Sequence, residues 1–209
     1  MLTREAMRIS DTPYEGWSPL MTAAWLGQDE IVRQILERKA AINKHDQEGH
    51  TALSRAAWKG HINIVKMLLQ NGADANIQHK SGMLPVMWAA REGHVKVVKL
   101  LTEKTGNLNH QLADGTTALL LAVEGENIDV VKILLDSRVK VDIAKSNGMT
   151  PILLACKTGS VDIWKLLVAA NANFRARNNV GEDAVWLAAF NNHVEVLRLL
   201  LKKGVVPRA

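Results

Sequence analysis

The chain has little of what builds a disulfide-linked or membrane-spanning protein. Cys156 is the single cysteine among 209 residues, which excludes an internal disulfide framework and fits a reducing compartment. No apolar run approaches the ~20 residues that a helix needs to cross a bilayer. Residues 1–10 are mixed and charged, unlike a signal peptide. We therefore expect an intracellular protein, in the cytoplasm or the nucleus, that does not insert into a membrane.

Sequence signatures of catalysis are missing as well. The chain has no Gly-x-x-x-x-Gly-Lys phosphate loop, no His-Glu-x-x-His zinc motif, no nucleophile elbow and no Cys-x-x-Cys pair. Its seven histidines show no spacing typical of metal ligands. We expect no catalytic residues, no metal and no cofactor. This expectation concerns the chain alone, because a longer parent protein could carry an enzymatic domain elsewhere.

What the sequence does contain is a repeat. Six glycines stand 33 residues apart, at Gly16, Gly49, Gly82, Gly115, Gly148 and Gly181. A fixed period of this length indicates stacked copies of one small unit, each of which buries its apolar side against its neighbours. Such an array favours a recognition surface over a single catalytic pocket.

Around each glycine the same sequence motif recurs. Residues 48–61 read EGHTALSRAAWKGH and are followed by INIVKMLL, and residues 82–94 read GMLPVMWAAREGH and are followed by VKVVKLL. A hydroxyl residue precedes proline in Ser18-Pro19 and in Thr150-Pro151, which is typical of the start of a helix. A glycine such as Gly60 then ends the first helix, and the apolar spacing that follows predicts a second one.

These motifs strongly resemble the ankyrin repeat over residues 13–206, nearly the whole chain. The resemblance implies an all-α fold, a solenoid of stacked helix-turn-helix units with short turn or β-hairpin loops and a concave binding face. The copies are expected at residues 13–45, 46–78, 79–111, 112–144, 145–177 and 178–209. Residues 1–12 are expected to be an N-terminal segment or partial cap. The apolar last helix favours a segment of a longer array.

Some positions depart from the common pattern. Glu126 and Asn192 stand where other copies have the glycine that ends the first helix, and asparagine tolerates the left-handed conformation better than most residues do. These changes leave the end of the first helix unpredicted in those two copies, but they do not alter the predicted fold. Cys156, Trp164 and Trp186 are expected to fill the core.

The net charge is +5, and a basic residue recurs at one position of every second helix: Arg33, Lys66, Lys99, Lys132, Lys165 and Arg198. Stacked helices would place these side chains in a stripe down one side of the array. The stripe is either the solvated face of six similar helices, which we favour, or a track for phosphates or an acidic partner.

Aromatic residues make up only 4% of the chain, yet five of the nine fall on variable positions of the first three copies. The resemblance implies that partners bind at the loop tips and at the exposed side of the first helices. Exposed aromatic patches and Trp, Tyr and Arg side chains typify interfaces. The candidate partner-binding residues are Tyr14, Trp17, Trp25, His50, Arg55, Trp58, Lys59, Met83, Trp88 and Arg91.

The leading hypothesis is a non-catalytic interaction module, a scaffold or adaptor. It would bind a protein or peptide segment with apolar and acidic residues across the concave face of repeats 1–4, as a monomer or as part of a longer array. One alternative is a reader of methyl-lysine or another cation through a tryptophan cage. Another is an oligonucleotide-binding protein that uses the basic stripe, although stripe and tryptophans would lie on different helices.

Overall fold

The computed structural model describes residues 16–205. The expected segment 1–12 and the candidate binding residue Tyr14 lie outside this range. Twelve helices follow one another in the described part of the chain: α1 (Pro19–Leu26), α2 (Asp29–Glu37), α3 (Ala52–Lys59), α4 (Ile62–Gln70), α5 (Pro85–Arg91), α6 (Val95–Thr102), α7 (Ala118–Glu124), α8 (Ile128–Asp136), α9 (Pro151–Thr158), α10 (Val161–Ala169), α11 (Ala184–Phe190) and α12 (Val194–Lys202). The predicted all-α solenoid of helix pairs is confirmed.

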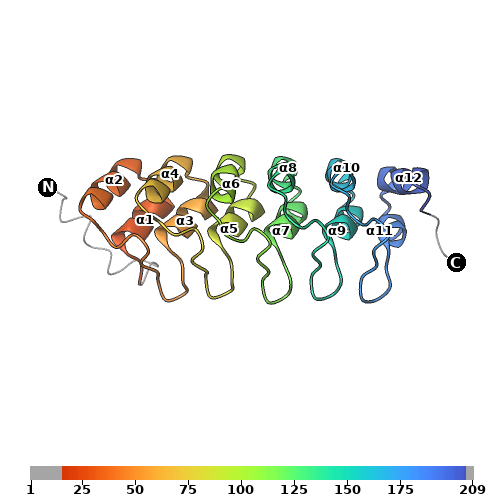
Figure 1. The fold of residues 1–209 in the computed structure, drawn as a ribbon, viewed down its shortest axis with the longest axis horizontal. Coiled ribbons are helices and arrows are strands. Elements are labelled where there is room, and N and C mark those ends of the chain that lie inside the picture. The colour runs from red at the N-terminus through yellow and green to blue at the C-terminus, as the bar shows by residue number, and fades with distance from the viewer. Residues whose placement is uncertain (1–15, 206–209) are drawn as a thin grey trace.

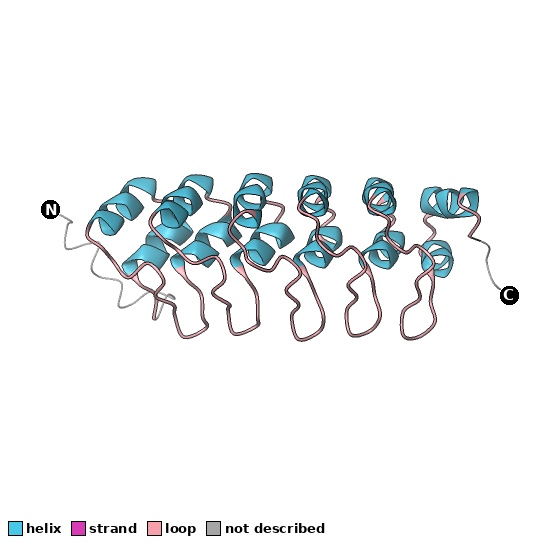
Figure 2. Ribbon diagram, in the orientation of Figure 1, coloured by secondary structure: helices cyan, strands magenta, loops and turns pink. Residues whose placement is uncertain are grey.

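The helices form two parallel rows (Figures 1 and 2). The odd-numbered helices, which come first in each repeat, pack side by side in one row, and the even-numbered helices form the other. The loops between repeats extend beyond the first-helix row. Two of them close an isolated antiparallel bridge, His45 with Thr51 and Arg177 with Asp183. The array therefore presents a first-helix side with its loops and a separate second-helix side.

Helices α1 and α9 begin where Ser18-Pro19 and Thr150-Pro151 predict, and most other first helices are capped in the same way. Ser18, Thr51, Thr117 and Thr150 each accept a hydrogen bond from the backbone N–H three residues later, and Asp183 does the same for α11. Each side chain satisfies one of the free amides of the first turn. Proline occupies the first turn of α1, α5 and α9, where its missing N–H costs nothing.

The bend between the two helices of a repeat shows why glycine recurs there. Gly60 has a φ of 77°, and a Cβ on it would lie 2.5 Å from Nδ1 of His94. His94 is the N-cap residue of α6, and its Nε2 lies 2.8 Å from the carbonyl oxygen of Trp58 in the preceding repeat. His61 and His193 make the equivalent contacts to Trp25 and Lys157. The bend histidines thus tie adjacent repeats together.

Where glycine is absent, another residue takes the left-handed conformation. Glu126 has a φ of 53° and Asn192 a φ of 60°, so the bend survives both departures from the pattern. Loop asparagines form a second set of ties between repeats: Oδ1 of Asn43, Asn76 and Asn109 accepts from the backbone N–H of Asp74, Gly106 and Lys140, respectively.

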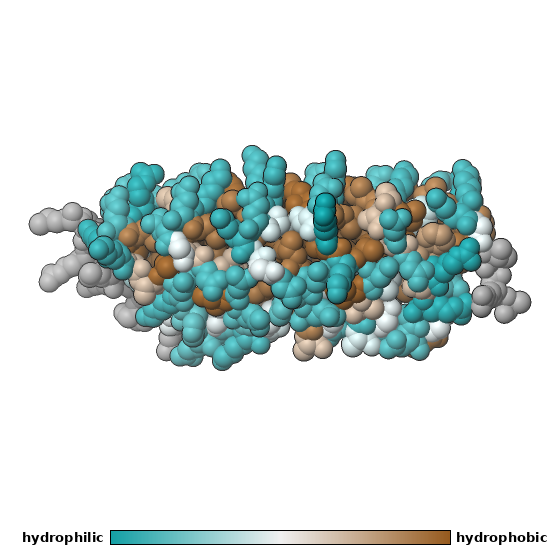
Figure 3. Space-filling view, viewed as in Figure 1, coloured by the Kyte–Doolittle hydropathy of each residue, from teal (hydrophilic) through white to brown (hydrophobic). Residues whose placement is uncertain are grey.

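One continuous apolar core runs along the array between the rows of helices. Polar side chains cover much of the face seen in Figure 3, and apolar groups show between them. Trp164 and Cys156 are buried as predicted, and burial raises the pKa of the Cys156 thiol to about 12. The prediction for Trp186 is wrong, because this side chain is 44% exposed. Its equivalents in earlier repeats are covered by the following repeat, whereas no described helix lies beyond α12.

Candidate protein-binding surface

Four tryptophans from the first three repeats form one continuous row of ring contacts. Trp17 and Trp25 meet edge to face with centroids 5.8 Å apart, and Trp25 meets Trp58 in the same way at 5.4 Å. Trp58 then stacks on Trp88 at 4.3 Å. Aromatic pairs in these geometries stabilise beyond the area that they bury. The row therefore forms a rigid apolar strip across three repeats.

Two histidines extend this strip toward the loops. The His50 ring lies 5.7 Å from Trp58, 5.3 Å from Trp88 and 4.2 Å from His79. Burial, followed by the nearby positive charge of Arg55, lowers the pKa of His50 from 6.5 to about 4, and burial also lowers the pKa of His79. Both rings therefore join the strip as neutral groups at neutral pH.

A buried ion pair lies at the first-repeat end of the strip. Nη2 of Arg55 donates to Oδ2 of Asp46 over 2.7 Å, and both side chains are more than nine-tenths buried. Although burial opposes ionisation of Asp46, the hydrogen bonds from Arg55 and from the His50 backbone outweigh it and lower its pKa. The guanidinium carbon of Arg55 also lies 3.7 Å from the centre of the Trp17 ring. Arg55 thus holds Trp17 and Asp46 in place.

Two exposed cations, Lys59 and Arg91, lie over rings of the strip. Nζ of Lys59 lies 4.8 Å from the Trp25 ring centre, and the guanidinium of Arg91 lies 4.6 Å from that of Trp88 and 5.4 Å from that of Trp58. Arg91 also contacts Glu92 at 3.0 Å. A surface ion pair of this kind contributes little. Both cations therefore remain available to a negatively charged partner.

The predicted site residues do not all lie at the surface. Lys59 and Arg91 are exposed, and Trp17, Trp25 and Trp58 are half-buried. The expectation of a surface position is wrong for four others, which lie beneath the surface because the neighbouring loop or first helix covers them: His50, Arg55, Met83 and Trp88. Five of the predicted side chains therefore form a surface, and the other four lie in the layer beneath it.

Sequence reasoning missed two members of this cluster, Asp46 and His79. Both occupy the same repeat position, three residues before the turn glycines Gly49 and Gly82. That position varies from repeat to repeat, and in the fifth repeat it is Lys145, whose Nζ bonds Glu124 of α7 over 2.7 Å. A comparison of this position across the copies would have brought the two residues into the candidate set.

Cations of the protein itself lie over the rings of the row, which bears on the cation-reader alternative. An aromatic cage must offer free ring faces to the bound ammonium group. Here Arg55, Lys59 and Arg91 already lie over Trp17, Trp25 and the Trp58–Trp88 pair. The positive charge of these groups would also repel a cationic ligand. The geometry therefore argues against a cage for methylated lysine.

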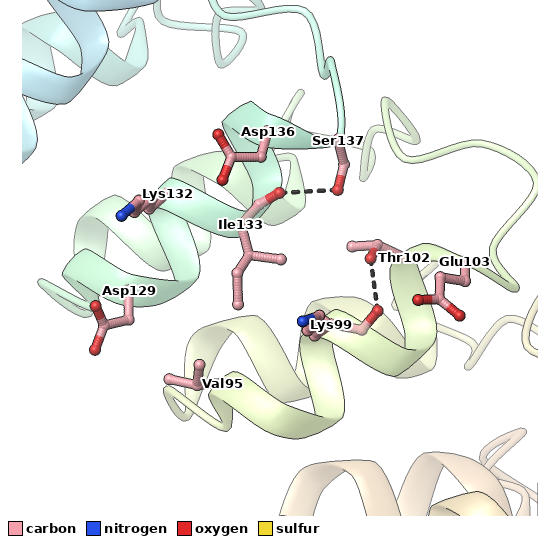
Figure 4. Close-up of a pocket in the computed structure, with 9 residues that line it drawn as sticks. All are labelled: Val95, Lys99, Thr102, Glu103, Asp129, Lys132, Ile133, Asp136 and Ser137. Atoms are coloured by element: carbon pink, nitrogen blue, oxygen red, sulfur yellow. Dashed lines mark hydrogen bonds between the residues drawn. The ribbon is translucent and has the colours of Figure 1, made fainter.

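The basic stripe lies on the other row of helices. All six of its side chains are exposed, and three of them, Arg33, Lys165 and Arg198, pair with an acidic residue one turn earlier. Between α6 and α8 a groove of about 530 Å³ mixes the lysines Lys99 and Lys132 with three carboxylates (Figure 4). Its Thr102 and Ser137 hydroxyls donate to backbone carbonyls of their own helices. This mixture of charges favours a solvated face.

Membrane-spanning helices and metal sites are both missing from the described residues. Across residues 16–205, no helix combines the length and apolar character needed to cross a bilayer. Within the same range, no three His, Cys, Asp or Glu side chains gather closely enough to bind a metal ion.

Comparisons with known proteins agree with the architecture. A family model described as ankyrin repeats matches residues 2–79, 71–146 and 137–209. The crystal structure of the ankyrin repeat protein EF0377 superposes with a TM-score of 0.81 at 29% identity, covering 88% of this chain and 96% of that one. An ankyrin repeat domain from Acinetobacter baumannii AYE gives a TM-score of 0.82 at 28% identity, covering 89% and 97%. No curated protein matches the sequence.

Proposed function

Because this chain belongs to the ankyrin-repeat family, whose members are generally protein–protein interaction modules, we propose that it is a non-catalytic scaffold or adaptor. A segment of the partner protein binds across the first-helix side of repeats 1–3. The observation that carries this proposal is the tryptophan row, in which three half-buried rings stand in contact with one another and with exposed cations.

The side chains of the tryptophan row indicate which kind of partner segment would bind there. Trp17, Trp25 and Trp58 offer apolar contact to a side chain of the partner, since large rigid aromatic groups contribute most where an interface excludes water. Lys59 and Arg91 stand beside these rings and attract carboxylates. The partner segment therefore combines apolar anchors with acidic residues. Binding needs no metal and no cofactor.

A capture experiment tests this proposal. Wild-type protein and the Trp25→Ala and Trp58→Ala variants are each immobilised, after circular dichroism has shown that the variants keep their helical content. Proteins bound from a cell extract are then quantified by mass spectrometry. We expect at least one protein to be recovered by the wild type and reduced about tenfold or more by each variant, since central aromatic anchors cost 2 kcal/mol or more when truncated. Equal recovery by folded variants would overturn the anchor assignment.

A further inference from the structure

One position of the first helix faces outward in each of repeats 1–5, and its side chains form a line, here called the outer line, along the first-helix side. In α1, α3 and α5 this position directly follows the buried alanine pair. The outer line consists of two half-buried tryptophans and three exposed charged residues: Trp25, Trp58, Arg91, Glu124 and Lys157. The centre of the Trp58 ring lies 5.4 Å from that of Trp25 and 5.4 Å from the guanidinium carbon of Arg91. Three successive repeats therefore present two apolar groups and one cation in contact with one another.

The two tryptophans of the outer line also carry hydrogen-bond donors that the fold leaves unused. The indole N–H groups of Trp25 and Trp58 donate to no described residue and reach solvent, whereas the N–H of Trp88 is sealed inside the protein. An indole N–H that becomes covered by a partner needs an acceptor, because a donor left unpaired in an interface costs binding free energy. The partner must therefore bring free carbonyl groups or other acceptors to this line.

The distance between repeats limits the conformation of such a partner. Adjacent first helices pack side by side, and packed helices lie about 8–10 Å apart. A polyproline II segment rises about 3.1 Å per residue with three residues per turn, so every third side chain returns to the same face after about 9 Å. It has no internal hydrogen bonds, and its carbonyl groups are therefore free. A β-strand turns its third side chain to the opposite face, and an α-helix uses most of its carbonyl groups internally.

We propose that the partner segment binds in the polyproline II conformation and places every third residue on one member of the outer line. The proposal rests on the proposed function, since it specifies the partner of the same site. Two apolar residues of the segment, three positions apart, contact Trp25 and Trp58, and an acidic residue three positions further along contacts Arg91. The two indole N–H groups donate to carbonyl groups of the segment. Surfaces lined with aromatic side chains are those that recognise this conformation.

The charges along the outer line show where the bound segment ends. Glu124 follows Arg91 in the line, but Nζ of Lys145 already pairs with it over 2.7 Å. Arg91 pairs with the exposed Glu92 beside it at 3.0 Å, and such a surface pair contributes little. A carboxylate of the partner can therefore replace Glu92 on Arg91, whereas Glu124 offers no comparable free charge. The segment that repeats 1–3 recognise is thus about seven residues long, the length of two steps of three residues.

Synthetic peptides test this spacing. The probe peptide has leucine at its first and fourth positions, glutamate at its seventh and proline between them, which favours the polyproline II conformation. Two comparison peptides have the same composition with these three residues two or four positions apart, and a third is an alanine-based helix with them seven positions apart. Intrinsic fluorescence follows each titration, because the peptides lack tryptophan and four of the six tryptophans lie in the strip. We expect the probe to bind about tenfold more tightly than the comparison peptides, or better.

A charge exchange places the acidic residue on Arg91. Arg91→Glu should weaken binding of the probe about tenfold, and a peptide with lysine at the seventh position should regain affinity for this variant. Lys157→Glu changes the same repeat position two repeats further along, and this control should bind the probe as the wild type does. Equal affinity for all spacings, no binding of the probe at millimolar concentration, or failure of the exchange would overturn the proposal. The proposed function would still stand if capture from an extract depends on Trp25 and Trp58.

Discussion

Some single residues in this array contribute to the structure of two repeats at once. Gly60 ends α3 in the left-handed conformation and also leaves room for the ring of His94, which belongs to the next repeat. Arg55 bonds Asp46 within its own repeat and covers Trp17 of the preceding one. A substitution at such a position therefore disturbs both a local conformation and a junction between repeats.

The two demands on Gly60 can be measured separately. Gly72 has a similar φ of 89°, but a Cβ placed on it would meet nothing within 4 Å. Gly72→Ala should therefore cost only the strain of the left-handed conformation, about 1–2 kcal/mol. Gly60→Ala should cost more, because the added methyl also displaces His94. Urea denaturation of both variants checks this, and equal losses would mean that the close approach to His94 is unimportant.

Titration of His50 gives the folded state a defined pH dependence. The unfolded chain binds a proton at His50 near pH 6.5, whereas the folded chain resists protonation until about pH 4. The unfolded state therefore binds more protons between these values, and folding stability falls as pH drops from about 6.5 toward about 4. The lowered pKa of His79 acts in the same direction.

A His50→Gln variant isolates this effect. Thermal unfolding of the variant and the wild type at a series of pH values should show that the wild type loses more stability across the window from about pH 6.5 to about pH 4. Asp46 acts mainly at lower pH, because its lowered pKa contributes stability that is present above the ordinary carboxyl pKa of 3.8 and is lost as the pH falls through it. Parallel curves for the two proteins would contradict the buried, neutral state of His50.

At the scale of the helices, burial depends on position in the array more than on residue type. Helix starts and bends could be read from the sequence, because capping hydroxyls, prolines and glycines act within a few residues of the chain. The exposure of Trp186 could not be read from the sequence, because its repeat position is buried only where the first helix of another repeat packs on it. The burial of Trp88, Met83 and His50 likewise depends on which loop side chains a neighbouring repeat supplies.

This dependence predicts unequal costs at equivalent positions of α9 and α11. Leu153→Ala empties a site that is fully buried and should cost about 2–5 kcal/mol. Trp186→Ala removes a larger side chain, but from an exposed site, and should cost about 1 kcal/mol or less. Urea denaturation measures both values. A greater loss for Trp186→Ala would show that its face is already covered within one chain.

For the whole molecule, the period of 33 residues predicted a stacked array, since each repeat needs only its neighbours to form a core, and the resemblance of the repeated motif to the ankyrin repeat predicted its all-α architecture. The candidate surface was only partly predictable. The tryptophans were visible as an excess of aromatic residues in three repeats. The cations over their rings, the buried Asp46–Arg55 pair and the contribution of His79 arise from contacts between loops and helices that no spacing in the sequence specifies.

If partners bind on the first-helix side of repeats 1–3, charge reversal there must weaken binding, whereas charge reversal on the second-helix row must leave it intact. Lys59→Glu with Arg91→Glu changes exposed cations beside the tryptophan row, and Lys66→Glu with Lys99→Glu makes the same change in charge on the second helices of the same repeats. In quantitative capture from a cell extract, we expect the first pair to lose partners that the wild type and the second pair retain. Equal recovery by both pairs, or equal loss, would contradict it.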